Sequence, residues 1–224
     1  VKHTEDEIAA INMIIGASFA GVRSMTATSG GGFSLMVEGL GLAGLSETPI
    51  VILEVQRCGP ATGLPTYTEQ ADLIFAINAS QGEFPLVVVA PGDVQECFDY
   101  GFEAFNIAER VQTPVIILSD KYLGEATCTL PRFDDSKLRV DRGKIASDEM
   151  MEKAVNFKRY ELTSDGVSTR CFPGQKNGMH VCSSYEHDET GFTSENPQNR
   201  VEQIGKRARK LDLISESVLA PKII

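Results

Sequence analysis

The chain has 224 residues and a mass of 24.3 kDa, which is enough to bury a full hydrophobic core. Hydrophobic residues make up 42% and charged residues 23%, as in ordinary globular proteins. The net charge of −10 argues against a nucleic-acid-binding protein, because no basic surface would neutralise phosphates. No apolar run is long enough to cross a bilayer and no secretory signal is visible, so we expect a cytoplasmic protein without membrane contact.

The first 129 residues alternate between helix and strand. We expect helices at residues 5–21, 33–45, 68–79 and 93–111, and strands at residues 23–28, 49–55, 86–90 and 114–118. Continuous apolar runs such as PIVILEV are typical of strands inside a parallel sheet, and Asp93 is placed to cap the fourth helix. The order predicts a doubly wound, mostly parallel α/β sheet with helices on both faces.

Two helices carry a further expectation about burial. The first, at residues 5–21, is apolar nearly all round, so we expect it to be buried on most faces. The helix at residues 199–213 is rich in Arg and Lys and is expected to lie solvated on the surface. It follows residues 131–191, which are polar and contain scattered Gly and Pro, so residues 130–224 are expected to form an irregular lobe.

Glu7 allows two interpretations. Thr4-x-x-Glu7 has the spacing of a capping box, and acids in a first turn favour the helix dipole. Alternatively, Glu7 faces inward, because it heads a stripe of Ile11, Ile14 and Ser18 on one helix face. A carboxyl placed there would have a raised pKa and could share a proton with a cofactor.

Glycines follow the first strand in the stretch Thr28-Ser29-Gly30-Gly31-Gly32. They allow a close backbone approach to a phosphate or a ring edge, or they form a tight turn between strand and helix. Residues 39–44 match G-x-G-x-x-G, but they lie late in a helix and before a strand. Because a dinucleotide site needs the opposite order, we interpret them as close helix packing.

The loop at residues 56–66 follows a buried strand, at the end of an α/β sheet where ligands bind. Arg57 offers a planar fork for a carboxylate, and Thr62 and Thr66 offer hydroxyls. The alternative is a long surface loop with a salt-bridged arginine.

Metal chemistry is not expected on this chain. The five cysteines are odd in number and scattered, without a C-x-x-C pair, as in a reducing compartment. Cys171, His180 and Cys182, and the acidic stretch at residues 186–189, match no structural zinc pattern. We interpret these residues as parts of turns and a surface hinge.

The sequence resembles the α subunits of the 2-oxoacid:ferredoxin oxidoreductases, in their 2-oxoglutarate and broad-specificity archaeal branch. The similarity is carried by EDEIAAINMIIGASFAGVRSMTATSGGGFSLM, QRCGPATGLPT, RYELTSDGVSTRCFPG and YEHDETGFTSENPQNR. The family usually has Ser-Gly-Pro-Gly where this chain has Ser29-Gly30-Gly31-Gly32.

The resemblance implies a thiamine diphosphate enzyme that oxidatively decarboxylates a 2-oxoacid to an acyl-CoA and reduces ferredoxin. Residues 1–129 would be the pyrimidine-binding domain, with Glu7 against the aminopyrimidine and Ser29, Gly30 and Gly31 beside the cofactor. Arg57 and Thr66 would bind the 2-oxoacid. A β subunit would share the cofactor and supply the magnesium site and the iron–sulfur cluster.

Two family features are missing from the sequence. A Tyr-Pro-Ile-Thr-Pro segment normally lies upstream, and an α/β domain normally follows the basic helix, so we expect residues before Val1 and a further domain after the lobe. Two other functions stay open: the pyrimidine domain of another thiamine diphosphate enzyme, such as a transketolase-like synthase, and an inactive homologue that binds a partner.

Overall fold

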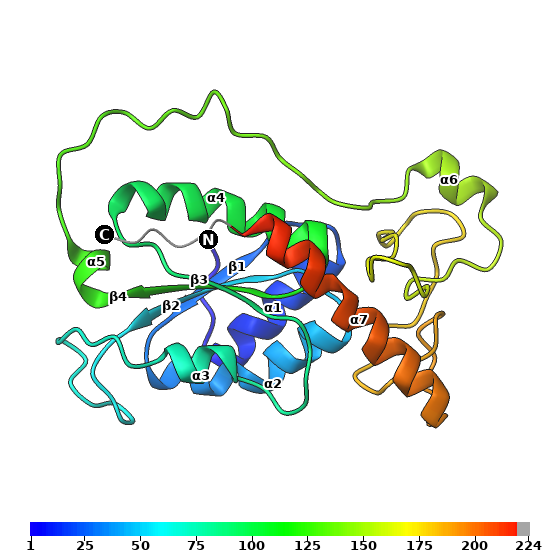
Figure 1. Cartoon of the computed structure of the whole chain (residues 1–224), viewed down its shortest axis with the longest axis horizontal. Helices are drawn as coiled ribbons and strands as arrows, with labels where there is room; N and C mark the ends of the chain where they lie inside the picture. The colour runs from blue at the N-terminus through cyan, green and yellow to red at the C-terminus, as the bar shows by residue number, and fades with distance from the viewer. Residues whose placement is uncertain (219–224) are drawn as a thin grey trace.

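The fold is built on a four-stranded parallel sheet, seen here in a computed structural model that describes residues 1–218 (Figure 1). The strands are β1 (Met25–Thr28), β2 (Val51–Gln56), β3 (Val87–Val89) and β4 (Val115–Asp120). They lie in the order β1-β2-β4-β3, so the chain reverses direction across the sheet between β3 and β4. The predicted doubly wound α/β fold is confirmed.

Helices cover both faces of this sheet (Figure 1). One face carries α1 (Glu7–Phe19), α2 (Gly31–Leu45) and α3 (Leu73–Ile77), and the other carries α4 (Val94–Val111) and α7 (Pro197–Ser217). Two short helices, α5 (Lys121–Glu125) and α6 (Asp148–Lys153), flank the long segment that crosses over α4. Asp93 caps α4 as predicted, since its carboxylate accepts a hydrogen bond from the Glu96 amide at 2.8 Å.

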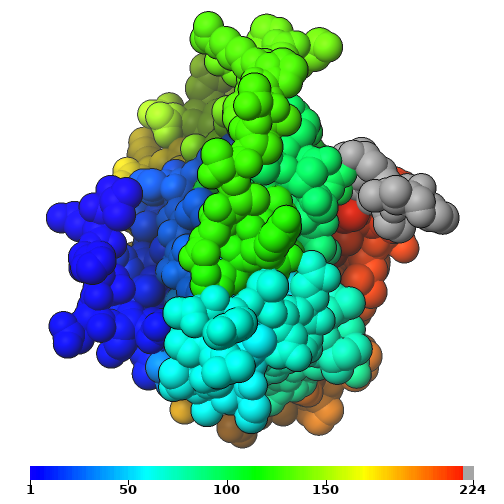
Figure 2. Space-filling model, turned by 90° about the vertical axis from the view of Figure 1, so that its left-hand side faces the viewer, coloured from blue at the N-terminus to red at the C-terminus, as the bar shows by residue number. Residues whose placement is uncertain are grey.

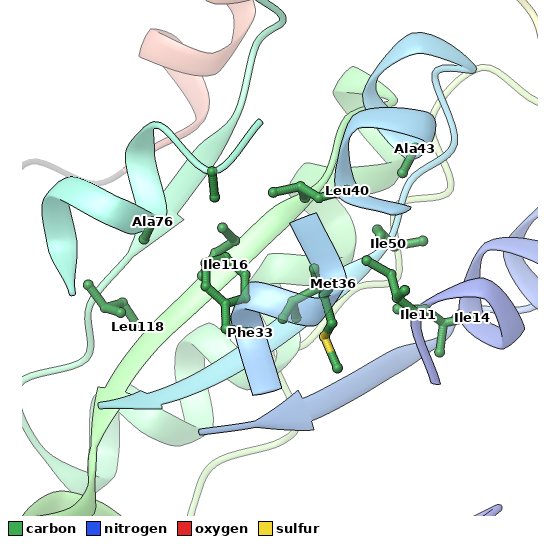
Figure 3. Packing of buried hydrophobic residues seen from close by; sticks show 12 residues of the cluster. Ile11, Ile14, Phe33, Met36, Leu40, Ala43, Ile50, Ala76, Ile116 and Leu118 are labelled. Carbon is green, nitrogen blue, oxygen red and sulfur yellow. The ribbon is translucent and has the colours of Figure 1, made fainter. Parts of the chain in front are cut away.

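The core consists of two layers because successive strand residues point to opposite faces. Ile52 and Ile116 pack with α1, α2 and α3, whereas Val51 and Val115 pack with α4. Figure 3 shows the first layer, where Phe33, Met36 and Leu40 of α2 meet Ile11 and Ile14 of α1.

The glycines at residues 39–44 serve this packing, as predicted. A Cβ atom on Gly39 would lie 2.7 Å from Cγ2 of Ile11, and one on Gly41 would lie 2.9 Å from Oγ of Ser80. The missing side chains therefore let α2 approach α1 and the segment after α3 closely.

Two of the predicted helices differ from the structure. The expectation that α1 is buried on most faces is wrong, because Ile8, Met13 and Phe19 are 52%, 49% and 37% exposed. The helix expected at residues 68–79 is only Leu73–Ile77. Residues 68–72 form a loop instead, because their polar groups bond to Gln56 and Asp120 at the ends of two strands.

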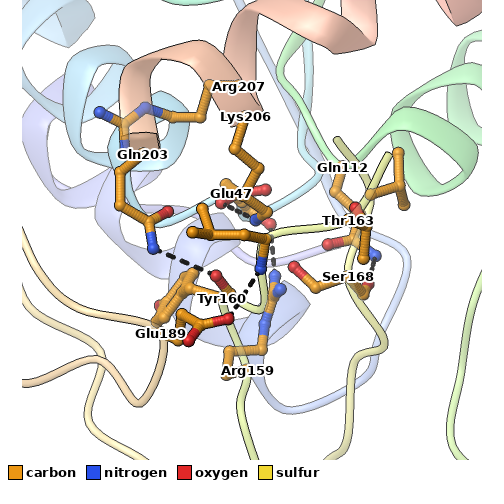
Figure 4. Close-up of polar contacts among 12 residues, drawn as sticks. Glu47, Gln112, Arg159, Tyr160, Thr163, Ser168, Glu189, Gln203, Lys206 and Arg207 are labelled. Atoms are coloured by element: carbon orange, nitrogen blue, oxygen red, sulfur yellow. Dashed lines mark hydrogen bonds and ion pairs between the residues drawn. The ribbon is translucent and has the colours of Figure 1, made fainter. Parts of the chain in front are cut away.

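The expectation that the basic helix lies solvated on the surface is also wrong, because α7 buries its charges. Lys206 and Lys210 are 0% and 1% exposed and both contact the carboxylate of Glu47, which is itself fully buried after α2. Figure 4 shows Lys206 of α7 and Arg159 of the lobe converging on Glu47 from two sides. Burial alone would raise the pKa of Glu47, but Lys210, Lys206 and Arg159 together hold it well below its usual range.

Further ion pairs join the lobe to the α/β part. Glu109 of α4 accepts Arg23 at 2.6 Å, Arg142 at 2.7 Å and Arg170 at 3.0 Å. Within the lobe, Glu186 forms a two-pronged pair with Arg207 of α7. The irregular lobe is thus attached by buried charge as well as by apolar packing. Among residues 1–218, no helix is long and apolar enough to span a membrane.

We predict that Glu47→Gln destabilises the fold by about 3 kcal/mol or more, because it leaves two buried lysines without their counterion. Urea unfolding followed by circular dichroism measures this, as the chain has no tryptophan. The control is Glu125→Gln, which breaks the exposed Lys121–Glu125 pair and should cost less than about 1 kcal/mol. Equal costs for the two variants would contradict a structural role for the buried cluster.

Candidate functional site

The candidate site lies where β1, β2 and β4 end. Parallel register places Thr28 of β1 beside Glu54 of β2, and Gln56 of β2 beside Asp120 of β4. Figure 2 looks onto this edge, around which the N-terminal residues, the loop of residues 57–72 and the segment after β4 gather (Figure 2).

Glu7 faces the glycine turn from the first turn of α1. The helix is capped by Asp6, whose carboxylate accepts a hydrogen bond from the Ala9 amide at 2.7 Å, so the capping-box interpretation with Thr4 is wrong. Glu7 is half-buried, and a Cβ atom on Gly32 would lie 2.7 Å from its Oε1 and would also overlap the Thr28 hydroxyl. The carboxylate, the hydroxyl and the bare glycine backbone therefore share one small niche.

The stripe below Glu7 is buried as predicted. Ile11, Ile14 and Ser18 are 0%, 7% and 3% exposed, and Ser18 donates a hydrogen bond to the Pro49 carbonyl at 2.6 Å. Glu7 is thus held by a helix face that is fixed to the core.

Arg57 lies across the same turn at Gly30. Gly30 has a φ of 59° at the N-cap of α2, and a Cβ atom there would lie 2.7 Å from Nε of Arg57. This Nε is buried and has no hydrogen-bond partner within residues 1–218. Position 30 therefore needs glycine, both for its positive φ and for the close approach of Arg57. The free Nε–H of Arg57 can donate a hydrogen bond to a ligand.

Glu54 is a functional candidate that the sequence analysis missed. Its Oε1 accepts a hydrogen bond from the Gly30 amide at 2.9 Å, while Oε2 is buried without a hydrogen-bond partner in the described part of the chain. Burial raises the pKa of Glu54 to about 7, and Asp72 adds to the shift. A single acid inside the apolar strand PIVILEV was the available sequence signal.

Asp120 positions the loop that carries Arg57. It caps α5 through the Leu123 amide at 2.8 Å and accepts a hydrogen bond from Gln70 at 2.7 Å. At the same end of the loop, the Asp72 amide donates to Gln56 at 3.0 Å. These bonds connect the end of the loop to the ends of β2 and β4.

The other predicted site residues have weaker links to the Glu7–Arg57 niche. The Ser29 hydroxyl donates to the Val55 carbonyl at 2.7 Å, which fixes the turn, and Gly31 begins α2 at the surface. Thr66 is exposed on the loop, and its side chain forms no hydrogen bond to the residues that the structure describes. The structure therefore brings Glu7, Gly30 and Arg57 together but does not bring Thr66 to them.

The histidines and cysteines of the lobe lie in irregular segments, and His187 forms an isolated bridge with Thr193, so the turn interpretation is wrong for them. Nδ1 of His180 lies 2.9 Å from the Gly178 carbonyl and 3.7 Å from Sγ of Cys171. All five cysteines are free, and no cluster of three or more possible metal ligands occurs in the described ranges. The surface-hinge interpretation is wrong for His187, which is fully buried against the ring of Tyr160.

Comparison with known proteins assigns a family. Residues 1–206 match the family described as "Pyruvate flavodoxin/ferredoxin oxidoreductase, thiamine diP-bdg". Over 220 residues the chain is 48% identical to subunit alpha of 2-oxoacid:ferredoxin oxidoreductase 1 from Sulfurisphaera tokodaii, covering 97% of this chain and 34% of that one. It is 39% identical over 196 residues to the 2-oxoglutarate synthase subunit KorA of Methanothermobacter thermautotrophicus, covering 87% and 50%.

A solved structure agrees with this assignment. The 2-oxoglutarate:ferredoxin oxidoreductase from Magnetococcus marinus, with 2-oxoglutarate, coenzyme A and succinyl-CoA bound, superposes with a TM-score of 0.91 at 41% identity. The match covers 97% of this chain and 37% of that one. The chain belongs to the thiamine diphosphate-binding family of pyruvate flavodoxin/ferredoxin oxidoreductases. It spans about a third to a half of the length of these relatives.

We predict that Gly32→Ala disturbs the niche whereas Gly31→Ala does not. The new Cβ atom at Gly32 would overlap Thr28 and Glu7 and cost about 1–3 kcal/mol, but at Gly31 its nearest neighbour lies 3.9 Å away. Gly31→Ala should be neutral or stabilising by up to about 1 kcal/mol, because alanine favours helix. Chemical denaturation of the two variants measures this, and equal stability would contradict the placement of Glu7.

We also predict that Glu54 makes stability depend on pH. Its folded pKa of about 7 exceeds its ordinary value of 4.5, so the folded chain keeps a proton that the unfolded chain has released between those values. Stability from this group therefore falls as pH rises through that range, by on the order of 3 kcal/mol. Glu54→Gln should remove this loss.

Urea unfolding at pH 5 and pH 8 measures the effect. Wild type should lose more stability than Glu54→Gln over this interval, and the exposed control Glu152→Gln should behave like wild type. If Glu54→Gln loses as much stability as wild type, then Glu54 is ionised at both pH values in the folded chain.

Proposed function

We propose that this chain belongs to the α subunit of a 2-oxoacid:ferredoxin oxidoreductase and forms its pyrimidine-binding domain over residues 1–129. The observation that supports this most strongly is the glycine turn after β1, which has the Glu7 carboxylate on one side and the Arg57 guanidinium on the other. An acid and an arginine that share one turn suit a cofactor that needs a proton partner and a substrate that carries a carboxylate.

The residues present fit the pyrimidine end of thiamine diphosphate. Gly32 leaves the Glu7 carboxylate uncovered by a side chain, and Gly30 does the same for Arg57. The Ser29 hydroxyl bonds to Val55 and Gly31 begins α2 beside this turn, and both residues are proposed to bind the cofactor. The diphosphate and magnesium are proposed to be bound by a β subunit, as the family resemblance implies.

Each residue has a defined task in the proposed reaction. Thiamine diphosphate, when bound, supplies the carbanion that attacks the keto carbon of the 2-oxoacid. Glu7 holds a proton against a nitrogen of the pyrimidine ring, which sets the ring's protonation state. Arg57 binds the substrate carboxylate through a charge-assisted pair, and Thr66 is proposed to complete this contact when the loop meets substrate.

The proposed partners follow from the family and from the exposed surface. A β subunit that carries magnesium and the iron–sulfur cluster would complete the enzyme, with coenzyme A as acyl acceptor and ferredoxin as electron acceptor. Ile8 and Met13 of α1 and Leu35 of α2 are 49–52% exposed and are apolar side chains available to such a subunit. The cytoplasmic location predicted from composition stays a prediction.

Two variants of the assembled enzyme separate the cofactor task from the substrate task. Glu7→Gln should lower turnover by about 10²–10⁴-fold, because proton transfer contributes that much, whereas the exposed neighbour Glu5→Gln should keep wild-type turnover. Arg57→Lys should raise KM for the 2-oxoacid about 10- to 100-fold and leave thiamine diphosphate affinity unchanged.

Steady-state kinetics beside thiamine diphosphate titration decides between these tasks. Near-normal turnover of Glu7→Gln would reduce Glu7 to a helix residue. An unchanged KM with collapsed cofactor affinity in Arg57→Lys would assign Arg57 to the cofactor or to the fold.

A further inference from the structure

A small, partly open cavity lies between the α/β part and the lobe, away from the glycine turn. It has a volume of about 20 Å³, enough for one small ion or one water molecule. Its lining includes Ser18 at the end of α1, Glu47 after α2, and the lobe residues Arg159, Tyr160 and Arg170. Nothing in the proposed reaction uses this cavity.

Both arginines in its wall keep buried donors without a partner. Arg159 and Arg170 are 5% and 4% exposed, and Nη1 of Arg159 and Nε of Arg170 have no hydrogen-bond acceptor within residues 1–218. Arg159 donates from Nη2 to the Glu47 carbonyl at 2.8 Å and lies 4.9 Å from the Tyr160 ring, but it forms no ion pair in the described part of the chain. A buried guanidinium without a carboxylate is costly unless another anion compensates it.

The charge around the cavity is unbalanced. Lys206 and Lys210 already share Glu47, and Arg170 shares Glu109 with Arg23 and Arg142. Four buried basic side chains, Lys206, Lys210, Arg159 and Arg170, therefore lie beside two buried carboxylates, Glu47 and Glu109, and burial lowers the pKa of Lys210 to about 7. Burial lowers the pKa of Arg170 to about 10, and the charge of Arg159 contributes to this shift.

The remaining polar groups in the wall cannot supply the missing negative charge. Burial raises the pKa values of Cys171 and Tyr160, which keeps the thiol and the phenol neutral. The hydroxyls of Ser18 and Ser46 donate to backbone carbonyls. Burial lowers the pKa of His180, so this ring stays neutral as well.

We propose that this cavity binds one small monovalent anion of the size of chloride, held by the N–H groups of Arg159 and Arg170. The anion neutralises part of the buried positive charge and joins the lobe to the ends of α1 and α2. The volume admits a halide. Its contribution to stability rises with halide concentration, because only the folded chain has the cavity.

Bromide tests the site directly, because it replaces chloride and scatters anomalously. Crystals of the assembled full-length enzyme grown in sodium bromide should show one anomalous peak in the cavity, within hydrogen-bond distance of Nη1 of Arg159 and Nε of Arg170. Ordinary water density without an anomalous signal at saturating bromide would overturn the proposal.

A solution measurement shows whether the anion binds outside the crystal. Replacing sodium gluconate by sodium chloride at constant ionic strength should raise the melting temperature of wild type by a few degrees. Arg159→Met should lose this response, and the exposed control Arg132→Met should keep it. If wild type melts at the same temperature in both salts, the bromide is an adventitious ion only, and the proposal fails. The crystal result on wild type stands even if Arg159→Met does not fold.

Discussion

The parallel pairing of β1 with β2 is the constraint on which the site depends. Because Thr28 lies beside Glu54 in register, the turn that follows β1 is positioned against the end of β2. The Gly30 amide then donates a hydrogen bond to Glu54, and the Arg57 side chain lies where a Gly30 side chain would be. The Glu7 carboxylate of α1 lies against Gly32 in the same way. One backbone turn without side chains thus brings together groups from three elements. A one-residue slip between these strands would separate them, since it would exchange the faces of every side chain in β1.

A second constraint, buried charge, attaches the lobe. Glu47 has a φ of 51° at the end of α2, and it is surrounded by Lys206 and Lys210 of α7 and Arg159 of the lobe. Breaking such a cluster costs more than breaking a surface pair, because the remaining charges cannot regain water. The cavity beside this cluster is lined by Arg159 and Arg170, each of which keeps one buried N–H without a partner among residues 1–218. The attachment of the lobe and the inferred anion site are therefore consequences of one charge distribution.

The order of elements could be predicted from the sequence because each buried strand is a continuous apolar run and each crossover is local. Glu7 and Arg57 could each be predicted as candidate site residues because both sit at ends of predicted elements. The remaining features depend on partners far along the chain. The local sequence of residues 68–72 predicts a helix, but the hydrogen bond from Gln70 to Asp120 keeps them in a loop. The composition of α7 predicts an exposed helix, but Lys206 is buried against Glu47, 159 residues away in the sequence. Glu54 was not predicted because its role depends on its hydrogen bond from Gly30 and on its proximity to Asp72, and no local sequence pattern indicates these contacts.

The central claim is that Glu7 and Arg57 form the two sides of one ligand site. Its most direct test is a crystal structure of the assembled enzyme with thiamine diphosphate and a 2-oxoacid. We expect a pyrimidine nitrogen within hydrogen-bond distance of the Glu7 carboxylate, and the substrate carboxylate against the Arg57 guanidinium across the Gly30–Gly32 turn. A cofactor bound elsewhere, with Glu7 facing only solvent or protein, would contradict it.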